Sequence, residues 1–77
     1  MDLFSELKMM IVNTFAIDAD AVVADAHLQD DLGADSLAVV RLAETIGTHY
    51  RIEILAEDLL DVANVGEIVA LMKSKIS

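Results

Sequence analysis

The fold is decided by residues 35–50, which read DSLAVVRLAETIGTHY. Asp35 and Ser36 are residue types that cap helix N-termini, so a helix is expected to begin there. Apolar residues then recur at intervals of three and four, which is the period of one helix face. These residues are Val39, Leu42, Ala43, Ile46 and Tyr50. The stretch predicts an amphipathic helix whose apolar face belongs to a hydrophobic core.

A second face of the same predicted helix is mixed in character. It is formed by Leu37, Val40, Arg41 and Glu44. Charged residues are rarely buried in a hydrophobic core, so this face is not expected to belong to it. This face is therefore available to meet a partner protein.

Upstream, helical spacing predicts an amphipathic helix from Asp2 to about Phe15. Its apolar face is Leu3, Leu7, Met10, Ile11 and Thr14. Between the two helices, isolated apolar residues stand among six Asp, with no Lys or Arg. The isolated residues are Ile17, Val22, Leu28 and Leu32. A loop of this length is functional or disordered, and its apolar residues favour an ordered, packed loop.

Downstream, charged and apolar residues alternate over residues 51–54, which predicts either a strand or an extended link. Residues 57–61 are long enough for only a short helical turn. Asn64 then opens a last helix, with Glu67 three residues later as in a capping box. The apolar face of this helix is Val65, Ile68, Val69 and Met72. The fold class predicted is all-α: one domain over residues 1–77, with three main helices and a short one in a four-helix bundle.

Composition narrows the possible functions. The 77 residues include no Cys, which excludes disulfides and thiolate zinc sites, while 56% hydrophobic content indicates a folded core. A net charge of −9 opposes binding to nucleic acid or an anionic membrane and favours partners with basic patches. No apolar run reaches the roughly 20 residues of a membrane helix, and Asp2 and Glu6 stand where a signal peptide needs positive charge. A cytoplasmic location is expected.

Ser36 is the polar residue of most chemical interest, because a helix N-terminus favours an attached phosphate group. The plainer interpretation is that Asp35 or Ser36 only caps the helix. A catalytic serine is not supported, since residues 34–38 read ADSLA where the hydrolase elbow reads Gly-x-Ser-x-Gly. The two histidines, His27 and His49, offer no sequence signal of pairing with Ser36.

The acidic loop also raises the question of calcium binding. An EF-hand loop needs an oxygen ligand, Gly and Glu at its fifth, sixth and twelfth positions. Counted from Asp18, those positions hold Val22, Val23 and Gln29, so the motif fails. A solvated acidic face is the favoured interpretation, weak divalent binding stays open, and no metal site is predicted.

Residues 31–37 read DLGADSL, which resembles the attachment-site motif of acyl carrier proteins. Residues 50–54, YRIEI, are similar to that family's aromatic-x-Ile-x-Ile segment, and the resemblance covers nearly the whole chain. The family's loop anchors match Ile17, Val22, Ala26 and Leu28.

The resemblance implies a right-handed four-helix bundle and a role as a tether for substrates, without catalysis. A phosphopantetheinyl transferase would attach 4′-phosphopantetheine from coenzyme A to the Ser36 hydroxyl, using Mg²⁺, and the arm's thiol would carry acyl groups as thioesters. Asp35 would help to engage the transferase, and Leu37 would pack against the transferase and other partners. Acyl-loading, condensing and acyl-transfer enzymes with basic patches are the partners implied, and a monomer is expected.

The resemblance also suggests where cargo and partners bind. An acyl chain would lie between the helices, although core packing explains each candidate equally well. The candidate lining is Val39, Leu42, Ala43, Ile46, Ile54, Leu59, Val62 and Ile68. The candidate partner-recognition residues are Asp35, Leu37, Val40, Arg41, Glu44, Glu57 and Asp58.

The predicted second main helix departs from the family's usual acidic pattern. Residues 36–50 contain one Glu and one Arg, so their formal charge is zero with His neutral. Positions that are typically acidic in the family read Ala38, Arg41, Gly47, Thr48 and His49. We therefore expect a specialised carrier for a lipid, lipopeptide or polyketide pathway, with housekeeping fatty acid synthesis as the close competitor. An aminoacyl or peptidyl carrier and an unmodified helical interaction module are the alternatives.

Overall fold

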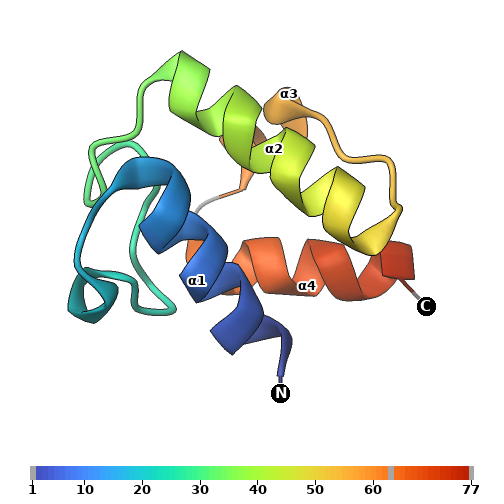
Figure 1. Cartoon of the computed structure of the whole chain (residues 1–77), viewed down its shortest axis with the longest axis horizontal. Coiled ribbons are helices and arrows are strands. Elements are labelled where there is room, and N and C mark those ends of the chain that lie inside the picture. The colour runs from blue at the N-terminus through green and yellow to red at the C-terminus, as the bar shows by residue number, and fades with distance from the viewer. Residues whose placement is uncertain (1, 63, 77) are drawn as a thin grey trace.

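The computed structural model describes residues 2–62 and 64–76, and within these ranges it contains helices and loops but no strand (Figure 1). The helices are α1 (Leu3–Phe15), the short 3₁₀ helix η1 (Ala19–Ala21), α2 (Ser36–Tyr50), α3 (Ala56–Asp61) and α4 (Val65–Ile76). The prediction of three main helices, a short one and a long loop after the first is confirmed.

Helix α1 ends at Phe15 as the apolar spacing predicts and begins at Leu3, one residue after the predicted start at Asp2. The Asp2 carboxylate accepts a hydrogen bond from the Ser5 N–H at 2.7 Å, which caps the helix and lowers the pKa of Asp2. At the other end Ala16 adopts a left-handed conformation, with φ of 57°. Leu7 and Ile11 are fully buried, so the predicted apolar face is the one that enters the core.

The long loop is packed against the core, as its apolar residues predict. Its buried side chains are Val22, Ala26, Leu28, Leu32 and Ala34, while Ile17 is half-buried.

Backbone hydrogen bonds join this loop to the start of α4. The carbonyl of Ala24 accepts from the Gly66 N–H at 2.8 Å, and that of Ala26 accepts from the Val65 N–H at 3.0 Å. Two N–H groups that the first turn of α4 cannot satisfy internally thus find partners in the loop. A Cβ at Gly66 would lie 3.2 Å from the Ala24 oxygen, so glycine permits this close approach.

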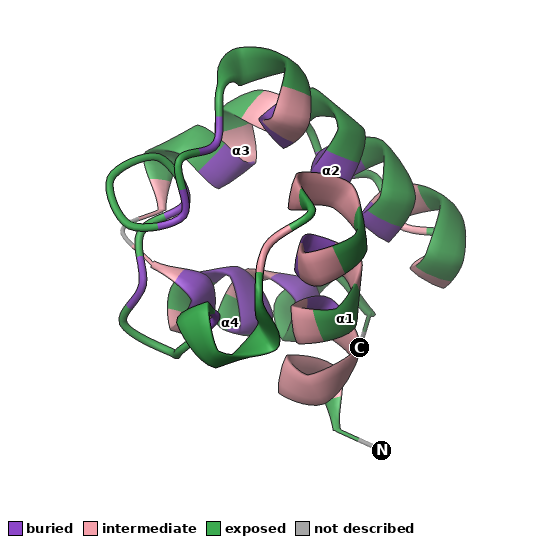
Figure 2. Cartoon of the chain, turned by 60° about the vertical axis from the view of Figure 1, so that its left-hand side comes forward, coloured by how far each residue is buried: buried purple, intermediate pink, exposed green. Residues whose placement is uncertain are grey.

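Helix α1 packs against both α2 and α4, and α3 packs against α2. The buried stripes of the helices face the interior, and their exposed residues lie outside (Figure 2). On α2 the buried residues are Val39, Leu42, Ala43 and Ile46, with Tyr50 half-buried; on α4 they are Val65, Ile68, Val69 and Met72. Both predicted stripes are therefore correct.

The segment after α2 is an extended link, which resolves the alternative left open for residues 51–54. Arg51 ends α2 in a left-handed conformation, with φ of 56°. Helix α3 starts at Ala56, one residue before the predicted turn, where the Asp58 carboxylate accepts from the Leu55 N–H at 3.0 Å. No helix among the described residues is long and apolar enough to cross a membrane.

Candidate functional site

The turn that precedes α2 is held by a dense set of backbone contacts. The N–H groups of Asp31 and Leu32 both donate to the His27 carbonyl at 3.0 Å, and the Asp31 carboxylate accepts from the His27 N–H at 2.9 Å. The Ala34 N–H donates to the Leu28 carbonyl at 2.8 Å. Because Leu32 and Ala34 are also buried, the turn is fixed to the core on one side.

The turn delivers Ser36 to the surface at the first position of α2. Gly33 has φ of 68°, a left-handed conformation that residues with a Cβ rarely adopt. Asp35 then caps the helix, and its carboxylate accepts from the Ala38 N–H at 2.8 Å. Ser36 itself is exposed. The cap prediction at Asp35 is confirmed, and Ser36 is left free of capping.

A hollow of about 280 Å³ lies beside this turn. Its walls come from the end of α1 (Thr14, Phe15), from residues 32–35, and from α2 (Leu37, Ala38, Arg41). The N–H groups of Ser36 and Leu37 make no hydrogen bond within residues 2–62 and 64–76. Apart from the cap Asp35, the start of α2 carries no acidic side chain, and its unpaired N–H groups give partial positive charge. A phosphodiester on the Ser36 hydroxyl fits the start of this helix.

Comparison with known proteins identifies the family. Residues 5–72 match the family model described as the phosphopantetheine attachment site. The chain is also 36% identical over 76 residues to an acyl carrier protein of Petrotoga mobilis. The aligned residues make up 99% of this chain and 89% of that relative. The chain belongs to the acyl carrier protein family. The family's cofactor is 4′-phosphopantetheine, and its members are carriers that serve a transferase and biosynthetic enzymes.

The mixed face of this carrier's α2 stays outside the core. Leu37 is 59% exposed and Val40 is 38% exposed, and Arg41 and Glu44 are exposed beside them. Two large apolar side chains on the surface next to two charges form a face that packing within the chain leaves uncovered.

The two candidate recognition residues of α3 differ in their surroundings. Glu57 is exposed, whereas Asp58 is half-buried and its carboxylate is engaged with the Leu55 N–H at the start of α3. Asp58 thus stabilises the start of α3, which Glu57 does not. The sequence pattern gave no means of telling the two residues apart.

The candidate acyl lining is packed core in this structure. Seven of its members are buried and Val62 is half-buried; the buried ones are Val39, Leu42, Ala43, Ile46, Ile54, Leu59 and Ile68. Leu59 and Val62 border a hollow of about 80 Å³, whose other walls are residues 27–30 and Leu60. The structure thus places Leu59 and Val62 next to the loop before α2. The other six candidates lie in the hydrophobic core.

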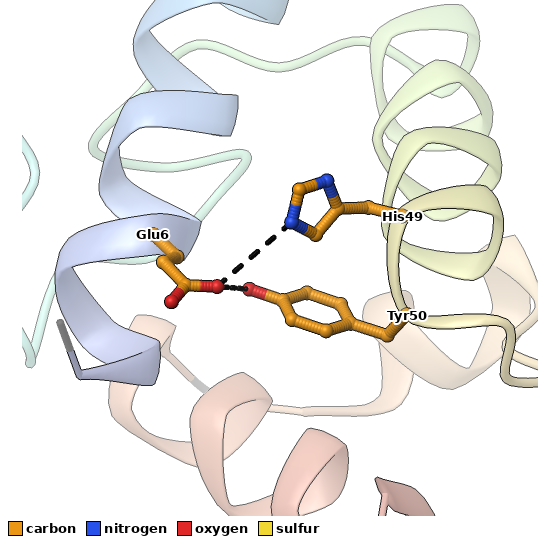
Figure 3. A network of polar contacts seen from close by, with 3 residues as sticks. All are labelled: Glu6, His49 and Tyr50. Atoms are coloured by element: carbon orange, nitrogen blue, oxygen red, sulfur yellow. Dashed lines mark hydrogen bonds and ion pairs between the residues drawn. The ribbon is translucent and has the colours of Figure 1, made fainter.

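A polar cluster between α1 and α2 was not foreseen from the sequence. The Tyr50 hydroxyl donates a hydrogen bond to the Glu6 carboxylate, and His49 Nε2 lies 3.9 Å from the same carboxylate oxygen (Figure 3). Burial, together with the Glu6 carboxylate, raises the pKa of Tyr50 to about 12. No sequence signal links positions 6 and 50, which meet only because α1 packs on α2. The two histidines have separate surroundings: His49 joins this cluster, and His27 lies in the turn before Ser36.

The acidic loop remains a solvated surface. Its exposed carboxylates belong to Asp18, Asp20, Asp25, Asp30 and Asp31. Among the described residues, no group of three or more acidic or histidine side chains is placed to hold a metal ion.

Proposed function

We propose that Ser36 is the attachment point of the 4′-phosphopantetheine arm and that the chain carries acyl groups as thioesters on it. The observation that carries this proposal is the exposure of Ser36 at the first position of α2, inside the segment matched by the attachment-site model. The surrounding turn is fixed to the core, so the hydroxyl is presented to a transferase at a constant place.

Each residue around Ser36 has a part in this proposal. Asp35 caps α2 and thereby leaves the N–H groups of Ser36 and Leu37 to face a phosphodiester. When bound, the arm supplies a thiol, and the chain itself has no Cys to compete with it for the cargo. Ser36 acts as a tether and not as a nucleophile toward the cargo.

We further propose that the carrier serves a dedicated lipid, lipopeptide or polyketide pathway in the cytoplasm, as a monomer. Support comes from α2, whose docking face carries Arg41 and Glu44 and no excess of acid. Leu37 and Val40 complete that face, and the cap residue Asp35, just before α2, adds one carboxylate beside it. Acyl-loading, condensing and acyl-transfer enzymes would dock there, and Glu57 with Asp58 would add attraction toward basic patches. The buried lining around Ile46 and Ile54 would open to admit an acyl chain.

An aminoacyl or peptidyl carrier is the second candidate function. The nearly neutral α2 is the observation that favours it, because an acidic second helix is the feature expected of fatty acid carriers. Incubation of the loaded carrier with acyl-activating or amino acid-activating enzymes, followed by intact mass measurement, separates the two functions.

The experiment that tests attachment is loading of the unmodified protein by a promiscuous phosphopantetheinyl transferase with coenzyme A and Mg²⁺. Intact mass should increase by one phosphopantetheinyl group in the wild type and in the control Ser74→Ala, and not in Ser36→Ala. No increase in the wild type, or an increase in Ser36→Ala, refutes the proposal. The loaded carrier is then offered to the host's housekeeping fatty acid enzymes; kcat/KM equal to that of the main host carrier would refute a specialised pathway.

A further inference from the structure

The hollow between the end of α1 and the start of α2 is suited to a protein side chain. Its volume of about 280 Å³ falls just below the roughly 300–1,000 Å³ of small-molecule sites. Its walls include the half-buried Phe15 and Ala38, the buried Leu32 and the exposed Leu37. The rest of the wall is polar, so an apolar side chain from outside would find apolar contacts on one part of the hollow and polar groups beside them.

The positive charge of Arg41 favours a negatively charged group at this hollow. Arg41 lines it, is exposed, and forms no ion pair in the part of the chain that the structure describes. Asp35 also lines the hollow, and its carboxylate is held at the start of α2 because it accepts a hydrogen bond from the Ala38 N–H. Arg41 is one of only five Lys and Arg residues in a chain of net charge −9. A guanidinium in this position matches a carboxylate in both charge and geometry.

We infer that this hollow is a docking pocket for a partner enzyme that inserts an apolar side chain between Phe15, Leu37 and Ala38 and pairs a neighbouring carboxylate with Arg41. The inference rests on the proposed carrier function and names the chemistry of the partner that this end of α2 selects. The remaining surface attracts basic partners, because most of its charges are acidic.

Selectivity follows from the single basic position. A partner whose basic patch extends over the pocket places like charge against Arg41 and is disfavoured. A partner with one carboxylate at that point gains an ion pair while its basic residues still meet the acidic loop. Arg41 therefore distinguishes among enzymes that the overall charge of the carrier attracts equally.

The experiment uses the full chain, loaded at Ser36, with each purified condensing enzyme and acyltransferase of the source genome. For the cognate enzyme, kcat/KM should fall about tenfold in Arg41→Glu and in Ala38→Leu, which fills the hollow. Arg51→Glu is the matched control: it also changes the net charge from −9 to −11, at the opposite end of α2, and should stay within about twofold. Changing the partner's paired carboxylate to Lys should restore transfer with Arg41→Glu.

Loading by the transferase is measured first for every variant, so the two proposals fail separately. No mass increase in the wild type overturns the carrier proposal. Normal loading with unchanged transfer in either Arg41→Glu or Ala38→Leu overturns the docking pocket. An equal loss in Arg51→Glu also overturns it, because the effect would then be one of net charge. Arg41→Gln, which removes the charge without reversing it, replaces Arg41→Glu if urea unfolding shows that the latter is not folded.

Discussion

Tyr50 is a single residue that joins two helices and couples them to pH. Its ring is half-buried at the end of α2, and its hydroxyl donates to the Glu6 carboxylate on α1. An ionised Tyr50 would lose this donated hydrogen bond and would face a carboxylate from a partly desolvated position. The folded state therefore holds the proton more tightly than the unfolded chain, and the pKa of Tyr50 rises from 10.0 to about 12.

The sign of the resulting pH dependence is fixed by that direction. The stabilisation from Tyr50 is fully present below about pH 10 and is lost as pH rises from 10 toward about 12. Tyr50→Phe should lower the free energy of unfolding by about 1.5 kcal/mol near neutral pH, the low end for a hydrogen bond to a charged group, because the pair is only partly buried. Urea unfolding of both proteins at several pH values should show the difference shrinking above pH 10. A difference that stays constant would contradict this assignment.

At the scale of elements, the unpaired N–H groups at the helix starts are satisfied either by a side chain next to the helix in sequence or by the backbone of the distant loop. Helix α2 uses the side chain of Asp35, and α4 uses the carbonyls of Ala24 and Ala26 together with the Asn64 side chain, which accepts from the Glu67 N–H at 3.0 Å. The start of α2 is thus stabilised locally, while the start of α4 depends on the loop.

Stability and recognition at Asp35 can be separated by two substitutions. Asp35→Ala removes the cap of α2 and should lower the free energy of unfolding by about 1 kcal/mol. Asp35→Asn keeps a good cap, so it should retain most of the stability while losing the charge. Urea unfolding measures the first property and the rate of loading by the transferase measures the second. If the transferase uses the carboxylate, Asn slows loading without loss of stability; an equal loss of stability in both variants would contradict the capping role.

At the scale of the whole molecule, the acidic charge is confined to a small body. The molecule measures 28 × 26 × 20 Å and carries fourteen acidic residues against five basic ones. At about 10 mM salt the Debye length is about 30 Å, so every carboxylate interacts with every other across the molecule. Folding concentrates this charge, and self-repulsion opposes it.

Added salt should therefore stabilise the fold near neutral pH. Raising NaCl from about 10 mM to about 1 M shortens the Debye length to about 3 Å, and Tm should rise by several degrees. The control is a triple variant, Asp18→Asn, Asp20→Asn and Asp30→Asn, which neutralises three exposed loop carboxylates and should show a smaller rise. A Tm that does not change across the salt series would count against self-repulsion.

Local periodicity predicted the helices well, because burial of an apolar stripe needs only residues three and four apart. Val39 and Ile46 on α2 and Val65 and Met72 on α4 are all fully buried, as their spacing indicates. The same reasoning did not choose between a strand and a link for residues 51–54, because a short alternating pattern fits both. The segment is a link because the described residues contain no strand with which it could pair.

By itself, the sequence determined the all-α class, the helix caps at Asp2 and Asp35, and the motif around Ser36, since each depends on residues close together in the chain. The tertiary structure alone decided which distant groups meet. It brought Tyr50 to Glu6, and it closed a hollow between Phe15 and Arg41. The physical reason is that contacts between helices depend on how the helices cross and on how deep each side chain lies. The apolar period of a single helix determines neither of these.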